Sequence, residues 1–188
     1  KDSTLAISDF HHVYCKGGTV TLEKCTLEEG AQSTLSVPAG GTVTAIESNL
    51  GATKANNVTV TGGTVNLNKS SVLGNVEGST EATHGIYVTK GNVNITDSAI
   101  NSTSGAAIRN AGGVVRATGL TVDKIKSHNV FASAGTTELK NSTLEPSDFH
   151  HIYCKGGEVL LDNCYLKAGV QCGLSIPTGG TVTACNTV

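Results

Sequence analysis

Hydrophobic and polar residues alternate strictly in a short segment that recurs along the whole chain. Each copy follows a turn that ends in glycine, and hydrophobic residues stand two and four positions later, with Thr137 as the one exception. The turn glycines are Gly18, Gly41, Gly63, Gly91, Gly113, Gly135, Gly157 and Gly180, at spacings of 23, 22, 28, 22, 22, 22 and 23 residues. An alternation with a period of two predicts a β-strand with one buried face.

Two further short apolar rows lie between successive glycine turns. One follows the first strand, as at Leu27 and Leu50, and the other precedes the next turn, as at Leu35 and Val37. Three short strands in every 22 or so residues predict a parallel β-solenoid, in which each rung buries its apolar rows against its neighbours. A meander or a β-sandwich would not keep so constant a spacing. We assign the extra residues of the 28-residue interval to the loop Asn75–Thr83.

A longer repeat overlies this one. Residues 1–45 match residues 140–184 at a constant offset of 139, with 29 identities. The clearest block is Ser8–Gly18 against Ser147–Gly157. Because 139 residues hold six rungs, the sequence predicts a six-rung module over residues 1–139 and the start of a second over residues 140–188. The chain begins and ends inside a module, so we expect further modules on both sides.

The rung pattern resembles that of the right-handed parallel β-helix proteins of microbial surfaces, such as autotransporter passengers and adhesin-like repeat proteins, and that of pectate-lyase-like folds. This resemblance covers the whole chain. It implies an all-β, right-handed, three-sheet parallel β-helix with about 22 residues per rung. It implies less about function, because this fold hosts both enzymes and inert stalks.

Composition narrows the function classes. The formal net charge is −2 and only 15% of residues are charged, without a Lys/Arg cluster, so we expect no nucleic-acid partner. No run of about 18 apolar residues occurs, so we expect no membrane span. The six cysteines indicate an oxidising compartment, and we predict a secreted, extracellular protein of the cell surface.

The segment His-His-x-Tyr-Cys occurs once in each module copy and gathers residue types that are scarce elsewhere in the chain. If Val13 and Cys15 point inward, His12 and Tyr14 point outward, and the second copy behaves alike. Scarce aromatics at a recurring surface position favour an interface, although Phe10 could instead lie beneath its own turn. The interface candidates are Phe10, His12, Tyr14, Lys16, Phe149, His151, Tyr153 and Lys155.

A shared metal site built on histidines of two modules is the alternative for this segment. A metal needs three or four converging ligands, whereas adjacent strand residues such as His11 and His12 point to opposite faces. We therefore predict no metal site and no cofactor.

Charged residues of the first strand fall in columns on successive rungs. Arg116 precedes Glu138 by one rung, and Lys140 precedes Asp162, so we expect two ion pairs. The resemblance to polysaccharide lyases would instead imply a catalytic site in which such residues supply a cation and a base, although no catalytic motif of those enzymes matches. Its residues would be Arg116, Glu138, Glu158 and Asp162.

The cysteines differ between the two module copies. Cys172 and Cys185 replace Ser33 and Ile46 together, which suggests a bonded pair. The other candidate pairs join Cys15 to Cys25 and Cys154 to Cys164, while Cys164 with Cys185 is a rival pair. Six cysteines allow 15 pairings, and small buried thiols remain an alternative to all of them.

These observations favour a non-enzymatic structural or adhesive β-solenoid, a segment of a tandem-repeat surface fibre or filament. Its expected partners are neighbouring modules or copies, with a host or cell-surface glycan as a further candidate. The alternatives are a polysaccharide-processing enzyme of the lyase or hydrolase type and a glycan-binding module without catalysis.

Overall fold

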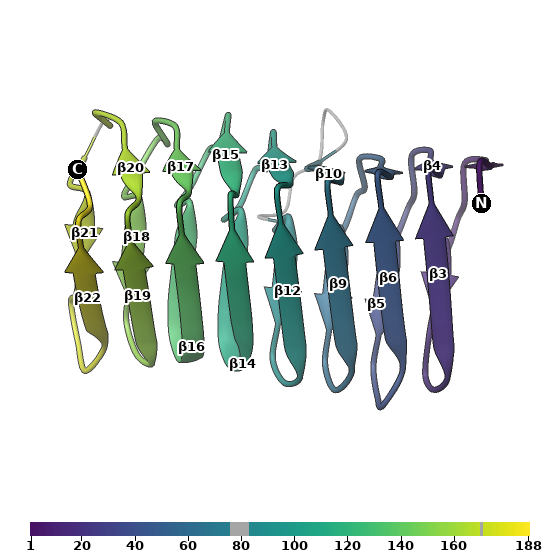
Figure 1. Ribbon diagram of the computed structural model, residues 1–188, viewed down its shortest axis with the longest axis horizontal. Coiled ribbons are helices and arrows are strands. Elements are labelled where there is room, and N and C mark those ends of the chain that lie inside the picture. Colours follow the sequence, from purple (N-terminus) through teal and green to yellow (C-terminus); the bar gives the residue numbers. More distant parts are fainter. Residues whose placement is uncertain (76–82, 170) are drawn as a thin grey trace.

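The computed structural model describes residues 1–75, 83–169 and 171–188, and in these residues the protein is all-β. Every strand pairing is parallel, and the strands lie in about eight stacked turns roughly 22 residues apart. The chain rises along the near strands of Figure 1 and descends behind them while it advances from the N-terminus to the C-terminus, so the coil is right-handed. The described residues contain no helix that could cross a membrane.

Each turn places its strands in three columns. One column forms an eight-stranded sheet: β1 (Thr4–Leu5), β4 (Thr26–Leu27), β7 (Asn49–Leu50), β10 (Ser71–Leu73), β13 (Ala99–Asn101), β15 (Thr121–Asp123), β17 (Thr143–Leu144) and β20 (Tyr165–Leu166). The second column holds β2 (Val13–Tyr14), β5 (Leu35–Val37), β8 (Val58–Val60), β11 (Ile86–Val88), β18 (Ile152–Cys154) and β21 (Leu174–Ser175). The third holds β3 (Thr19–Glu23), β6 (Thr42–Ile46), β9 (Thr64–Asn68), β12 (Asn92–Thr96), β19 (Glu158–Asp162) and β22 (Thr181–Cys185).

The second and third columns join where two long strands run around the corner between them. β14 (Ile108–Thr118) and β16 (Val130–Lys140) each pair with both columns, so all these strands belong to one 14-stranded sheet. A register shift between Asn110 and Val114 marks the bend in β14. Buried Asn110 stabilises this bend, because its side-chain oxygen accepts the N–H groups of Gly112 and Gly113 while its amide donates to Thr136 O and Thr137 Oγ1.

One rung is longer than the others. Its strands pair with the next rung at an offset of 28 residues, for example Ser71 with Ala99, whereas most neighbouring rungs pair at 22. The additional residues therefore lie between β10 and β11. The loop predicted over Asn75–Thr83 falls mainly on residues 76–82, outside the described residues.

The inward rows fill the interior with small and medium-sized side chains. Leu35, Val37 and Leu50 are fully buried, like their counterparts on the middle rungs, which confirms the predicted apolar rows. The last rung differs: Leu174 is 42% exposed and Ile176 47%, although they correspond to Leu35 and Val37. Their rung has a neighbour on one side alone within the described chain.

A left-handed residue turns the chain from the third column to the first on every rung. Lys24, Glu47, Lys69 and Asp97 have φ between 47° and 54° at this corner. The next residue is often an inward serine, and these serines form a ladder. Ser48 Oγ accepts the N–H of Cys25, and Ser70 Oγ accepts that of Ser48, at 3.0 and 3.1 Å. Each hydroxyl thus supplies a partner for a buried N–H group that the turn leaves unpaired.

Candidate functional site

Histidine followed three residues later by an aromatic residue occurs on four rungs. The structure places the aromatic positions in line on the outer side of the second column, because Tyr87, Arg109, Phe131 and Tyr153 are direct register partners on successive rungs. The histidines lie beside them, each in the turn that precedes the strand. We call this surface the aromatic face, and it comprises His84, Tyr87, Arg109, His128, Phe131, Phe149, His150 and Tyr153. It lies along the far side of the rod in Figure 1.

His128 is the centre of the aromatic face. Its ring stacks on that of Tyr153 with centroids 4.8 Å apart and on that of His150 at 5.4 Å. Phe131 meets both the His128 and the Tyr153 rings edge-on, at 5.7 and 5.0 Å. Such edge-on and stacked pairs add about 0.5–1.5 kcal/mol each beyond simple burial. Phe149 completes the cluster at 5.6 Å and is 45% exposed.

The histidines of this face share one orientation. His84 Nδ1 accepts the N–H of Ala106 at 3.0 Å, and His128 Nδ1 accepts that of His150 at 3.3 Å. His150 points its Nδ1 the same way and meets the Cys172 thiol at 3.1 Å. Burial, with smaller effects of Arg109 and His150 respectively, lowers the pKa of His84 and of His128 to about 4. Both rings are therefore neutral at neutral pH.

Arg109 carries the permanent positive charge of this cluster. Its guanidinium lies over the ring of Phe131, with Cζ 3.7 Å from the ring centroid, which is a cation–π contact. Nη1 donates to Ser133 Oγ at 2.8 Å and to Asn110 O at 3.4 Å. Burial lowers the pKa of Arg109, but a guanidinium stays protonated throughout the physiological range.

The structure corrects one of the predicted surface residues. His151 is 3% exposed; its Nδ1 accepts a hydrogen bond from the Asn129 amide at 2.7 Å, and its Nε2 donates one to Lys167 O at 2.5 Å. Its counterpart His12 is half-buried and bonds to Ala6 O at 3.0 Å. Alternation does not extend into the turn before the strand, so the outward histidines are His11 and His150 instead.

The remaining interface candidates lie at the surface. Phe10 is 70% exposed and Tyr14 59%, so Phe10 does not lie beneath its own turn. Tyr153 is half-buried by its stacking partners. The exposed candidates also include Lys16, Phe149 and Lys155. No contact with a partner follows from exposure alone, so their role as an interface stays a prediction.

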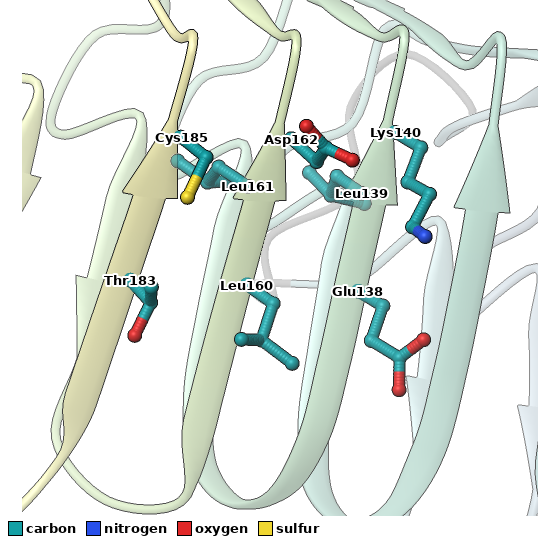
Figure 2. Close-up of a pocket in the computed structure, with 8 residues that line it drawn as sticks. All are labelled: Glu138, Leu139, Lys140, Leu160, Leu161, Asp162, Thr183 and Cys185. Carbon is teal, nitrogen blue, oxygen red and sulfur yellow. The ribbon is translucent and has the colours of Figure 1, made fainter.

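A second candidate site is a shallow groove of about 310 Å³ on the third column near the C-terminal end. Figure 2 shows Glu138, Leu160 and Thr183 side by side on its wall. Glu138 pairs with Arg116 at 3.3 Å, as predicted. The second predicted pair does not form: Lys140 and Asp162 are register partners, but the Lys140 side chain extends away from the Asp162 carboxylate (Figure 2).

The four residues of the site that the lyase resemblance implies do not converge on one point in the structure. Arg116 and Glu138 neutralise each other, Asp162 lines the groove, and Glu158 begins β19 outside the groove lining. Within the described chain, no three His, Cys, Asp or Glu side chains converge as a metal site would require.

The expected disulfides are not supported, because all six cysteines are free thiols in the structure. Cys172 lies beside His150 in the turn before β21, whereas Cys185 ends β22 and lines the groove. Cys15 and Cys154 lie in the second column and their thiols contact glycine carbonyls. The other two buried thiols are Cys25 and Cys164.

No protein-family model, no curated protein and no solved structure matches this chain. The function of the candidate sites is therefore argued from their geometry. Sequence reasoning missed Arg109, Phe131, His128 and His150. The His-x-x-Tyr/Phe spacing, which recurs at His11, His84, His128 and His150, could have found all of these except Arg109.

Proposed function

We propose that the chain is a segment of a non-enzymatic, extracellular structural and adhesive β-solenoid, part of a tandem-repeat fibre at the cell surface. The observation that supports this most is the unbroken axial stacking of the rungs. The third column pairs in register from β3 to β22, and the first from β1 to β20. Such ladders resist bending and protease attack, because every inner strand has both edges paired.

The contacts between side chains of neighbouring rungs agree with a structural role. Two ion pairs join neighbouring rungs on the outer surface: Arg116 with Glu138, and Lys167 with Glu145 at 2.5 Å. The inward polar groups form ladders, as Ser48 and Ser70 do. These contacts stabilise the stack of rungs.

Antibodies raised against the purified chain and viewed by electron microscopy on the cells that produce it test this proposal. We expect label along filaments outside the cell, and protease treatment of intact cells should release the labelled material as resistant rods. Label confined to the cell interior, or a diffuse soluble antigen that cleaves polysaccharide, would contradict the proposal and favour the enzyme alternative.

A further inference from the structure

Arg109 has hydrogen-bonding capacity that the fold leaves unused. A guanidinium carries five N–H donors, and Nη1 supplies both of its own to Ser133 and Asn110. The Nε and Nη2 groups donate no hydrogen bond to the part of the chain that the structure describes. No carboxylate in that part of the chain forms an ion pair with the guanidinium. The edge that remains has the geometry that binds two oxygens of one oxyanion through two parallel hydrogen bonds.

The other arginine shows what a structural role looks like in this fold. Arg116 lies on the same strand, β14, but in the third column, and its Nε is 3.3 Å from the Glu138 carboxylate. The chain contains these two arginines alone. Arg116 is neutralised by the next rung, whereas half-buried Arg109 has no counter-charge among the described residues.

The surroundings of Arg109 favour an anion and exclude a cation. The outward positions in register with it contain no aspartate or glutamate; they are Tyr14, Ser36, Thr59, Tyr87, Phe131, Tyr153 and Ser175. Lys16 and Lys155 lie further along the same side. The ligand that this surface complements carries negative charge.

The same surroundings favour a hydroxylated ligand over a bare ion. The phenolic hydroxyls of Tyr87 and Tyr153 have no partner among the described residues, and both rings are half-buried with their polar ends accessible. Tyrosine and arginine held rigidly by stacking lose little conformational entropy when they bind a ligand, which is why binding surfaces are rich in both. These groups lie in one line along the rod, on rungs about 4.8 Å apart, which suits an extended ligand.

We propose that the aromatic face around Arg109 binds a sugar that carries a singly charged oxyanion, a carboxylate or a sulfate ester, with the Nε–Nη2 edge of the guanidinium on the oxyanion. The proposal rests on the adhesive part of the function proposed above and gives that adhesion its ligand. Carboxylate and sulfate share the charge and the oxygen geometry that the guanidinium edge recognises, and the experiment distinguishes them.

The test is a titration of the whole 188-residue chain with methyl glucuronide, glucose 6-sulfate and methyl glucoside, followed by NMR. Two arginines give two Nε–H signals, which Arg109→Gln and Arg116→Gln assign. We expect one or both charged sugars to shift the Arg109 signal and to leave the Arg116 signal in place, while the neutral glucoside has no effect at the same concentration. A shift with the glucuronide alone identifies a carboxylate ligand, and a shift with the sulfate alone a sulfated one.

The two variants also supply matched controls. Arg109→Gln should weaken binding by about tenfold or more, since a charge-assisted hydrogen-bond pair is lost, whereas Arg116→Gln should bind as the parent chain does. Equal shifts of both signals, equal binding of the neutral glucoside, unchanged binding by Arg109→Gln, or no binding of any probe would each overturn the proposal. Because these measurements use the isolated chain, their failure leaves the fibre proposal standing, and failure of the surface labelling leaves this site standing.

Discussion

Exposure separates the six cysteines into two groups at the scale of single residues. Cys15, Cys25, Cys154 and Cys164 are at most 3% exposed, and they pack in the interior as small apolar side chains. Burial raises the pKa of the Cys154 and Cys164 thiols, which disfavours the reactive thiolate. The two cysteines that differ between the module copies are the exposed ones, Cys172 and Cys185.

We therefore expect two thiols of the reduced, folded chain to react with Ellman's reagent and four more to react only after unfolding. Mapping of labelled peptides should find the early label at Cys172 and Cys185, and Cys172→Ser should remove one equivalent. Early label at a buried cysteine would show that the inward rows are misplaced. Mass mapping that finds Cys172 joined to Cys185 in native material would restore the disulfide.

Residue-scale chemistry also shows where sequence patterns stop being informative. Period-two alternation correctly placed Val13 and Cys15 inside, because both lie in or directly beside a strand. It failed at His151, where the turn changes the direction of the side chain and an asparagine on the neighbouring rung supplies a partner. Arg109 was overlooked because its significance depends on lacking a partner, and only the neighbouring rungs reveal that.

At the scale of elements, the corner between the second and third columns depends on one buried amide. Asn110 occupies an inward position that is apolar on other rungs, such as Val88 and Ala132, and it satisfies several groups at the bend of β14. The sequence shows that an asparagine interrupts this apolar row, but it does not show why. The reason is the pair of glycine N–H groups that no strand partner reaches.

Asn110→Ala should destabilise the chain by about 2–4 kcal/mol, because it leaves buried backbone N–H groups unpaired. Urea unfolding followed by circular dichroism measures this change. Asn94→Ala is the matched control, since that side chain bonds to Asn66 Oδ1 at 2.9 Å on the outer side of the third column; its cost should stay below about 1 kcal/mol. Equal costs for the two variants would contradict the role assigned to Asn110.

The half-buried histidines of the aromatic face, His84 and His128, make the free energy of unfolding depend on pH. The pKa of His84 is about 4 in the folded chain and ordinarily 6.5, so the unfolded chain takes up a proton first as the pH falls. The free energy of unfolding should therefore decrease between pH 6.5 and 4, by at most about 3 kcal/mol for this residue. His128, which is more exposed, should contribute less.

NMR titration of the histidine ring protons gives these pKa values directly. Urea unfolding at pH 7 and pH 5 should show a smaller pH dependence for His84→Gln than for the parent chain, since the variant lacks the titrating group. A ring pKa near 6.5 for both His84 and His128 would show that water reaches these two rings, contrary to their packing in the aromatic face.

At the scale of the whole molecule, the nearly constant spacing of rungs made the fold predictable. A solenoid needs only nearest-neighbour contacts, so 22-residue periodicity determines strand direction, stacking and the inward rows together. The bent strands β14 and β16 and the aromatic face depend on contacts between particular rungs, so periodicity could not reveal them. The six-rung module stays a prediction from the 139-residue repeat, although β2 to β6 and β18 to β22 do form corresponding strands.

Cryo-electron microscopy of filaments isolated from the native surface tests the fibre most directly. Six rungs of about 4.8 Å give a module rise of about 29 Å. We predict averaged power spectra with a meridional layer line near 4.8 Å and an axial repeat near 29 Å. Native material that consists of compact particles, or filaments that lack the 4.8 Å spacing along their axis, would contradict a fibre built of stacked solenoid modules.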